Sequence, residues 1–587
     1  MCGIFGITGA KDNAAQLVFD GLQKLDYRGY DSWGIVVKAA GGKLITAKHI
    51  GKLPSSPPDL PASPIGLGHT RWATHGGVTD ANAHPFLDCH SQLALVHNGI
   101  IENYLDLKRQ LKTKHTFTSE TDTEILLHLI EEYHQDLPLV DAVRKAFAES
   151  QGLNAIIVID ATTDTLVAAK TGSPLVIGLG KSQNFIASDL WSLLHHTRAV
   201  YFLADGQLAV LTPKQVILQD VTTGKNLALK PQIIDWQEET SSKGDFPHFM
   251  IKEIGEQPQV LLNILSEKTA DVTKLSQLIK ASRGAFLTGC GTAAYAAMAG
   301  EYFFSRIAKR HINPAIGSEF IYHANFLKPE SLLIALSQSG ETIDTLGSVK
   351  LAKNQGTTTV GIVNVLGSSL YRLVDEKILL GAGPEKAVAS TKSFTAKVAI
   401  LLLTAKLLAG KLPDGKQELI HAAQAIKAVL APDYRAKIRR LAVDLKDREH
   451  IFVVGRGQSY PAALEAAIKI KEVSYIHAEG LAGGELKHGP IALIEPGTPC
   501  IVIAPKDETY GDVLSGAMEM AARGGRIIGI SCEPNPIFDD YLPVVNCGDA
   551  TLIPQVVIAQ LLAYELALAR GLDPDKPRNL AKSVTVK

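Results

Sequence analysis

The second half of the chain contains the same short pattern twice, and this repeat restricts its fold more than any other feature. An apolar run ends in a glycine-rich turn and leads into an alanine-rich stretch, first at 284–292 and again at 450–458. A buried strand, a glycine turn and a helix in succession are the unit of a doubly wound parallel sheet. We therefore expect two α/β doubly wound subdomains here, with ligands at the carboxyl ends of their strands.

The next strand of each copy ends differently. The run at 332–342 closes in the hydroxyl-rich turn Ser337-Gln338-Ser339-Gly340-Glu341-Thr342, whereas the run at 499–507 has no such turn. Hydroxyls and backbone N–H groups where a strand meets a helix can bind a phosphate dianion, although one hydroxyl would suffice as a helix cap. Because no P-loop lysine is present, a sugar phosphate fits better than a nucleoside triphosphate.

The first half of the chain has a different character. Up to about residue 231, short β-rich runs alternate with turns, and helical patterns lie only near 13–25 and 121–133. This pattern is typical of a sheet-rich α+β domain. A chain of 587 residues exceeds a single core. The expected divisions are a first domain at 1–234, a polar linker at 235–246, α/β subdomains at 247–425 and 426–570, and a tail at 571–587.

A cysteine at the second position gives the amino terminus a candidate nucleophile. If Met1 is removed, Cys2 carries both a thiol and a free α-amine, so one residue supplies the nucleophile and the base. The alternative is that Cys2 has no catalytic role and lies in a frayed terminus. Gly3 and Gly6 flank an apolar pair, which favours a buried strand instead.

Composition excludes several classes of function. The chain has 59 basic and 60 acidic residues and a net charge of -1. It therefore has no overall positive charge that would attract nucleic acid or an anionic membrane. The six cysteines are scattered without zinc-type spacing, so we expect reduced thiols in the cytoplasm, no metal and no cofactor. No signal peptide opens the chain, and we take the longest apolar stretch, 398–410, as too short to span a bilayer.

The motifs of the chain resemble those of a known family, the glutamine--fructose-6-phosphate aminotransferases (isomerizing), over essentially the whole length of the chain. The matching segments of the first half, shared in part with other N-terminal-nucleophile amidotransferases, are 2–4, 27–32, 69–76, 97–100 and 119–123. Those of the second half are more specific and lie at 337–342, 388–392, 485–490 and 577–586. The resemblance implies an αββα glutaminase domain followed by two sugar isomerase (SIS) subdomains.

For the first domain the resemblance implies hydrolysis of glutamine. Cys2 would attack the side-chain amide, and Asn98 with the backbone N–H of Gly99 would stabilise the oxyanion. The amino-acid head group of glutamine would be held by Arg71, Thr74, His75 and Asp122. Trp72 would gate a passage for ammonia, with a simple core aromatic as the alternative.

For the second half it implies amination and isomerisation of fructose 6-phosphate. Glu472 would move the proton between C1 and C2, His488 would assist ring opening, and Lys582 would form an imine with the ketose. The residues implied to bind the sugar phosphate are Thr292, Ser337, Gln338, Ser339, Thr342, Val388, Ser390 and Lys469. A homodimer is expected, with no nucleic-acid or membrane partner.

Two other functions stay open. Ala293 stands where the family is expected to have serine, so the chain could aminate or deglycate another ketose phosphate. A non-catalytic sensor of sugar phosphates is the third interpretation. It predicts missing catalytic groups, yet Cys2, Glu472, His488 and Lys582 are all present.

Overall fold

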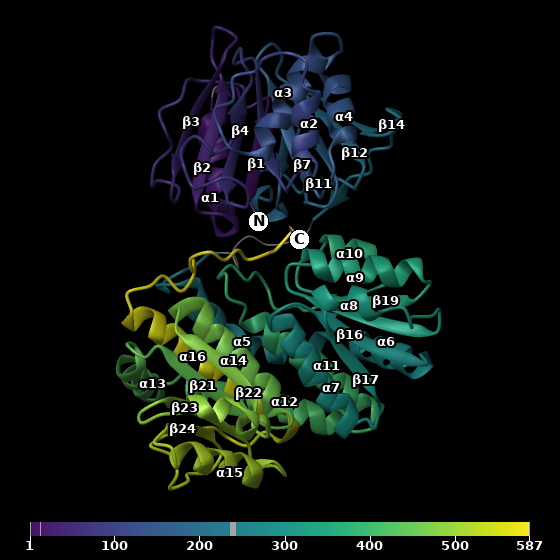
Figure 1. Ribbon diagram of the computed structural model, residues 1–587. Helices are drawn as coiled ribbons and strands as arrows, with labels where there is room; N and C mark the ends of the chain where they lie inside the picture. The colour runs from purple at the N-terminus through teal and green to yellow at the C-terminus, as the bar shows by residue number, and fades with distance from the viewer. Residues whose placement is uncertain (1, 12, 235–241, 586–587) are drawn as a thin grey trace. The chain divides into compact units, whose positions relative to one another are not determined.

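The structure is a computed structural model that describes residues 2–11, 13–234 and 242–585. The chain divides into two compact units, an amino-terminal unit of residues 1–240 with 581–587 and a carboxy-terminal unit of residues 241–580 (Figure 1). Most of the predicted linker, 235–241, lies outside the described residues, and so does Met1.

Two antiparallel sheets form the centre of the amino-terminal unit. The first has the strand order β15-β11-β9-β10-β1-β4-β2-β3 and the second the order β14-β13-β12-β8-β7-β6-β5. The strands of the first sheet are β1 (Gly3–Thr8), β2 (Ser32–Lys38), β3 (Leu44–Ile50), β4 (Ile65–Arg71), β9 (Val176–Leu179), β10 (Asn184–Ala187), β11 (Ala199–Phe202) and β15 (Gln232–Ile233). Those of the second are β5 (Phe86–Leu87), β6 (Leu93–Asn98), β7 (Ala155–Asp160), β8 (Leu166–Lys170), β12 (Gln207–Leu211), β13 (Val216–Asp220) and β14 (Asn226–Leu227).

The alternation of side chains along β1 shows how the layers arise. Ile4 belongs to the apolar layer between the two sheets, whereas Phe5 and Ile7 pack on the other face among residues of α1 (Ala14–Leu25). The outer face of the second sheet is covered by α2 (Tyr104–Gln110), α3 (Asp122–His134) and α4 (Leu139–Glu149). The result is the expected αββα sandwich, with β1 a fully buried strand.

The carboxy-terminal unit contains two parallel five-stranded sheets. Their orders, β17-β16-β18-β19-β20 and β22-β21-β23-β24-β25, repeat the same topology, which confirms the prediction of two doubly wound subdomains. The strands are β16 (Gly284–Gly289), β17 (Ile312–Ile316), β18 (Ser331–Ser337), β19 (Thr358–Val363), β20 (Glu376–Leu379), β21 (His450–Gly455), β22 (His477–Ala482), β23 (Pro499–Ala504), β24 (Arg526–Ser531) and β25 (Asp540–Pro543). The helices are α5 (Phe249–Glu267), α6 (Thr269–Ala281), α7 (Thr292–Arg306), α8 (Gly317–His323), α9 (Ile343–Asn354), α10 (Ser369–Leu373), α11 (Lys392–Leu408), α12 (Leu412–Val429), α13 (Pro432–Leu445), α14 (Ser459–Ser474), α15 (Tyr510–Ala521) and α16 (Leu552–Ala569).

One hydrophobic cluster runs through both subdomains and includes residues of α5, α11, α14 and α16. Within the described residues, α16 with its preceding turn, 548–569, is long and apolar enough to cross a bilayer by composition, and 89% of its most apolar window is buried inside the unit. Burial on all sides explains this composition, since a core helix is apolar all round. The expectation that 398–410 is the longest apolar stretch is therefore wrong.

The two ends of the carboxy-terminal unit are joined by side chains. Both carboxylate oxygens of Asp575 accept from the first backbone N–H groups of α5, at 2.7 Å from Phe249 N and 2.8 Å from Met250 N. Farther along α5, Gln257 Nε2 donates to Gln560 Oε1 on α16 at 2.8 Å. The residues after α16 thus cap the first helix of the same unit.

Candidate active sites

Cys2 lies at the start of β1, beside the residue that follows β4. Its Sγ accepts from the backbone N–H of Trp72 at 3.2 Å and lies 3.5 Å from the Trp72 carbonyl oxygen. Burial raises the pKa of the Cys2 thiol, while the Trp72 N–H and the charge of Arg71 act in the opposite direction. A group that takes the thiol proton is therefore required before attack.

Asn98 ends β6 and faces Cys2. Its Nδ2 donates to the Cys2 carbonyl oxygen at 3.0 Å, and its Oδ1 lies 3.1 Å from His69 Nε2. The same His69 nitrogen lies 3.1 Å from the carbonyl oxygen of His97, which can only accept, so Nε2 carries the proton. His69 therefore fixes the Asn98 amide with its NH₂ group toward Cys2.

Gly99 follows with a backbone conformation that requires glycine. Its φ is +136°, and a Cβ there would lie 2.4 Å from the carbonyl oxygen of Leu153. The ring of the preceding His97 is held on both sides, by Thr123 Oγ1 and by Asn154 Oδ1, each at 2.9 Å. The segment from His97 to Gly99 is thus rigidly placed.

Arg71 is buried and organises the loop after β4. Its guanidinium donates to the carbonyl oxygens of His75 at 2.5 Å, Gly77 at 3.1 Å and Gly76 at 3.2 Å. Asp122, the first residue of α3, is also buried, and its Oδ2 accepts from the Ile101 N–H at 2.7 Å. Arg71 is therefore no surface ion pair, and its charge interacts with both Cys2 and Asp122.

The other two predicted head-group residues lie in this loop. Thr74 is exposed, whereas the His75 ring stands edge-on to Tyr104 with centroids 4.7 Å apart. Trp72 is half-buried, and its described contacts with Cys2 are made by its backbone.

The hydroxyl-rich turn of the carboxy-terminal unit lies between β18 and α9. Ser337 Oγ accepts from the Gly340 N–H at 2.9 Å and lies 3.2 Å from Thr342 Oγ1, while Ser339 Oγ accepts from the Glu341 N–H at 3.1 Å. Gly340 has a φ of +67°, and a Cβ there would lie 2.1 Å from Ser368 Oγ. The strand thus enters α9 through a tight turn of hydroxyls and N–H groups. Thr342, its N-cap residue, makes no side-chain cap bond and so leaves this helix end open.

The neighbouring turn places Thr292 at the same edge. Strands β16 and β18 are adjacent and parallel, so the turns that follow them meet at their carboxyl ends. Thr292 begins α7 and is buried, as is Ala293, with an exposed fraction of 8%. A Cβ on Gly291 would lie 3.9 Å from the side chain of Ile468, which brings α14 of the second subdomain to this turn.

Three charged residues line one face of α14. Lys469 Nζ forms a short ion pair with Glu472 Oε2 and lies 3.7 Å from Glu465 Oε1. Burial raises the pKa of Glu465 to about 7, with the charge of Glu472 adding to the shift and that of Lys469 opposing it. The two carboxylates raise the pKa of Lys469 despite its complete burial. A stable ammonium thus sits between a titrating and a paired carboxylate.

Ser390 and Val388 belong to the segment before α11. Ser390 Oγ lies 3.3 Å from Glu385 Oε2 and 2.6 Å from Ser393 Oγ, and Glu385 also accepts from the Thr391 N–H at 2.9 Å. The Val388 N–H donates to the Asp575 carbonyl oxygen at 3.1 Å. Gln338, in the hydroxyl-rich turn, accepts at its carbonyl from the Asn364 N–H at 3.1 Å.

Two further predicted catalytic residues, His488 and Lys582, come from other segments than the α14 triad of Glu465, Lys469 and Glu472. His488 ends a short 3₁₀ helix, Glu485–His488, and is exposed, and the structure describes no hydrogen bond of its side chain. Lys582 is half-buried and groups with the amino-terminal unit, whereas Glu472 belongs to the carboxy-terminal unit.

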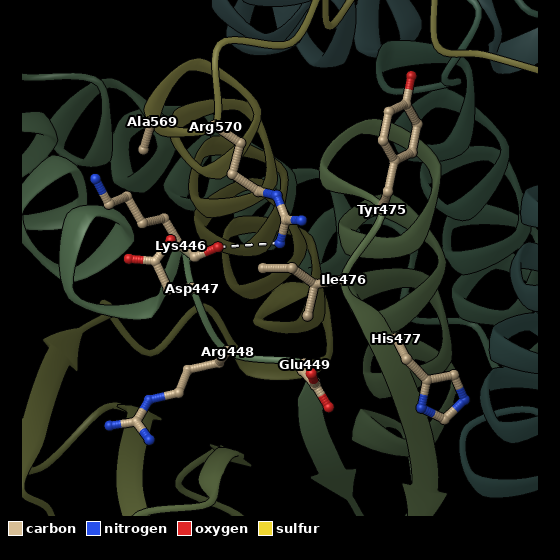
Figure 2. A pocket seen from close by; sticks show the side chains of 9 residues that line it. All are labelled: Lys446, Asp447, Arg448, Glu449, Tyr475, Ile476, His477, Ala569 and Arg570. Carbon is tan, nitrogen blue, oxygen red and sulfur yellow. Dashed lines mark hydrogen bonds between the residues drawn. The ribbon is translucent and has the colours of Figure 1, made fainter.

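A large cavity of about 660 Å³ lies elsewhere in the second subdomain (Figure 2). It is lined by residues that precede β21 and β22, and Arg570 Nη1 crosses it to donate to the Lys446 carbonyl oxygen at 3.0 Å. These are the amino ends of the strands, opposite to the edge where doubly wound sheets bind ligands. This cavity is not the sugar site predicted from the sequence.

Sequence reasoning missed two residues of these sites. His69 stands inside a recognised motif, but its role depends on Asn98 and His97 across the unit. Glu465 lies one helical turn before Lys469, and an i, i+4 acidic residue on a buried helix face was the available signal.

Comparison with known proteins relates both halves to one family. The glutamine amidotransferase domain model matches residues 59–232, and the SIS domain model matches 277–407 and 444–569. The chain is 41% identical over 603 residues to glutamine--fructose-6-phosphate aminotransferase [isomerizing] of Pyrococcus horikoshii, with all of both chains covered. It is 40% identical over 614 residues to the protein of that name from Shigella flexneri, again with full coverage. The chain belongs to the glutamine--fructose-6-phosphate aminotransferase (isomerizing) family.

A solved structure matches the carboxy-terminal part. The C-terminal domain of glucosamine-fructose-6-phosphate aminotransferase from Francisella tularensis has a TM-score of 0.54 and 34% identity to the chain. The match covers 57% of this chain and 99% of that one. The paired parallel sheets therefore belong to the family architecture.

Proposed function

We propose that this chain transfers ammonia from glutamine to fructose 6-phosphate and isomerises the product, forming glutamate and glucosamine 6-phosphate. The observation that carries the proposal is the presence of two candidate sites in one chain. Cys2 is set beside Asn98 in the amino-terminal unit, and the hydroxyl-rich turn lies at the sheet edge that α14 approaches in the other.

In the glutaminase reaction the Cys2 thiolate attacks the side-chain carbonyl of glutamine. The amide of Asn98 and the backbone N–H of Gly99 stabilise the oxyanion, ammonia leaves, and water hydrolyses the thioester to glutamate. Arg71 and Asp122 hold the α-carboxylate and α-ammonium of glutamine, and Thr74 and His75 close the pocket. Removal of Met1 supplies the α-amine as base.

In the isomerase reaction the phosphate binds the hydroxyl-rich turn and the open end of α9. Thr292, Gln338, Val388 and Ser390 surround the sugar. His488 assists ring opening, Lys582 forms an imine with C2, and ammonia replaces the lysine. Glu472 then moves a proton from C1 to C2, with Lys469 holding its carboxylate in place.

The ammonia must pass between the reactions without meeting bulk water, since protonation would destroy its nucleophilicity. Trp72 adjoins the nucleophile and is the proposed gate. A homodimer is also part of the proposal.

A second candidate is a glutamine-dependent reaction on another ketose phosphate. Ala293 favours it, because a buried methyl group stands at the start of α7 where a hydroxyl would reach toward the sugar. Turnover of a panel of ketose 6-phosphates separates the two, since a preference of more than tenfold for another ketose would displace fructose 6-phosphate.

The test of the proposed function is the Cys2→Ala variant. Glutamine hydrolysis should fall by about 10⁴-fold or more, because no other group forms the thioester. Isomerisation of the sugar phosphate should persist, since the Cys2 thiol takes no part in that step. Cys532→Ser, a partly exposed cysteine of the carboxy-terminal unit, is the matched control. Retained hydrolysis in Cys2→Ala contradicts the assignment.

A further inference from the structure

Four potential metal ligands from separate segments converge in the amino-terminal unit. Cys89 lies in the turn between β5 and β6, His115 between α2 and α3, and His128 and Glu131 on α3 itself. One ligand atom from each lies within 4.8 Å of all the others. None of these residues takes part in the proposed reaction.

The distances between the ligand atoms fit a tetrahedral ion. Cys89 Sγ lies 3.5 Å from His115 Nδ1 and 3.9 Å from His128 Nδ1. Glu131 Oε2 lies 3.1 Å from His115 Nδ1 and 2.8 Å from His128 Nδ1. Zn²⁺ with one sulfur and three nitrogen or oxygen ligands holds them about 3.3 to 3.6 Å apart. Small side-chain adjustments therefore suffice to close the site around an ion.

The hydrogen bonds around the cluster leave a lone pair directed inward. His115 Nε2 lies 3.2 Å from Glu132 Oε1, a carboxylate that can only accept, so Nε2 carries a proton. In a neutral ring the Nδ1 lone pair faces Glu131 Oε2 at 3.1 Å, a position where a metal ion can replace the second proton of a charged ring. The pair of His115 Nε2 with the Glu132 carboxylate is the usual outer support of a metal ligand.

His128 supplies a second, independent observation. Its side chain is fully buried, and its Nε2 has no hydrogen-bond partner. Glu124 Oε1 lies 4.0 Å away, and the carboxylate of Glu124 is fixed by N–H and O–H donors from Thr118 and Ser119. Coordination through Nδ1 places a proton on Nε2, directed toward this fixed carboxylate.

We propose that Cys89, His115, His128 and Glu131 bind one Zn²⁺ ion through Sγ, Nδ1, Nδ1 and Oε2. Mixed sulfur, imidazole and carboxylate ligands select zinc over magnesium or calcium. Four protein ligands leave no open position, so the ion is structural rather than catalytic. It ties the segment between α2 and α3 to the body of α3, whose first residue is Asp122.

Metal binding at Cys89 is coupled to the release of a proton. Zinc binds cysteine as the thiolate, so the Cys89 thiol must lose its proton when the ion binds. Binding therefore exchanges this proton for the metal and releases it to solvent. The exposed position of Cys89 gives an ion access to the site.

The experiment uses the full chain stripped with a chelator and titrated with Co²⁺ alone. We expect saturation at about one Co²⁺ per chain, with visible bands of tetrahedral cobalt and a sulfur-to-cobalt charge-transfer band that Zn²⁺ abolishes. Cys89→Ser should remove the charge-transfer band, and His128→Gln should weaken binding by about 100-fold. Cys532→Ser should change neither.

A second control addresses chelation by the amino terminus, where Cys2 carries a thiol. Cys2→Ala should keep the full cobalt spectrum. Tryptophan fluorescence checks the fold of each variant, because all four tryptophans precede residue 241. Zn²⁺ should raise the unfolding temperature reported by this fluorescence in the wild type but not in Cys89→Ser. Absence of the cobalt bands in the wild type, or their survival in folded Cys89→Ser, overturns the proposal.

Discussion

Asn98 Nδ2 lies 3.0 Å from the carbonyl oxygen of Cys2, and the other end of its amide is held by His69. The proposed donor for the oxyanion is thereby oriented before any substrate arrives. Such preorganisation lowers the cost of stabilising charge in the transition state.

Replacing Asn98 by alanine should lower kcat for glutamine hydrolysis by about 10² to 10³-fold with little change in KM, because the lost donor acts on the transition state. Steady-state kinetics with glutamine measures this split. Asn184→Ala is a control in the same unit, since its Nδ2 donates to the Thr212 carbonyl oxygen instead. A rise in KM alone would make Asn98 a substrate-binding residue.

Replacing Ser337, Ser339 and Thr342 together with alanine should raise KM for the sugar phosphate more than tenfold, since each hydrogen bond to a charged group contributes about 1.5 to 3 kcal/mol. Binding measured by calorimetry checks the affinity directly. The control is Ser266→Ala with Thr273→Ala, whose hydroxyls bond only to carbonyl oxygens of their own helices. Unchanged affinity in the triple variant would move the phosphate site elsewhere.

Affinity for the sugar phosphate should fall as the pH rises through about 7, where buried Glu465 ionises. Its new negative charge beside Lys469 opposes binding of an anion. KM measured from pH 6 to 8 should therefore show an inflection that Glu465→Gln removes. Glu479→Gln, a half-buried residue on β22, is the control and should keep it. Persistence of the inflection in Glu465→Gln would assign the titration to another group.

The amino-terminal unit should lose stability in mild acid. Burial lowers the pKa of His69 to about 3, whereas the unfolded chain has an ordinary histidine near 6.5. Between these values the unfolded state binds more protons, so the free energy of unfolding falls by about 1.4 kcal/mol per pH unit as the pH drops below 6.5. His84, also held neutral by burial, adds to the slope.

Denaturant unfolding followed by tryptophan fluorescence measures this slope for the amino-terminal unit alone. His69→Gln should reduce it by about 1.4 kcal/mol per pH unit, because one buried neutral histidine is lost. The exposed His90→Gln should leave it unchanged. An equal slope in wild type and His69→Gln refutes the prediction.

Trp72→Ala should leave glutamine cleavage intact but release ammonia, so that glutamate formed exceeds glucosamine 6-phosphate formed. Truncation after Asn579 should instead stop the sugar chemistry, because Lys582 is lost, while basal glutaminase activity remains. The product ratio distinguishes a gate from a catalyst. A one-to-one ratio in Trp72→Ala would mean that this side chain only packs.

Much of the fold follows from local sequence, because the strand–turn–helix repeat and the apolar pair between Gly3 and Gly6 are short-range patterns. Helices α2 and α4 were not predicted. Both are short, and α4 has its apolar face against a sheet distant in sequence, so its stability depends on tertiary packing.

The site residues also divide into those that a local pattern predicts and those that only the fold brings together. The hydroxyl-rich turn is contiguous and was visible, whereas the partners of Asn98 are brought together only by β4 and β6. Cys89 and His115 are likewise far apart in sequence, and no regular spacing marks them as ligands. Contacts between segments far apart in the sequence leave no local pattern by which they could be predicted.

The cap that Asp575 places on α5 means that the carboxy-terminal unit holds its own beginning and end together. A fragment from residue 242 to 580 would carry both halves of this clasp and should fold without its neighbour. A fragment that stops before Asp575 would leave the first N–H groups of α5 uncapped. This would destabilise the hydrophobic cluster that α5 shares with α16. Joining the two ends of the fragment and cutting a surface loop elsewhere would give a circular permutant with the same hydrophobic core. In this unit, therefore, the fold does not depend on the order of the segments along the chain.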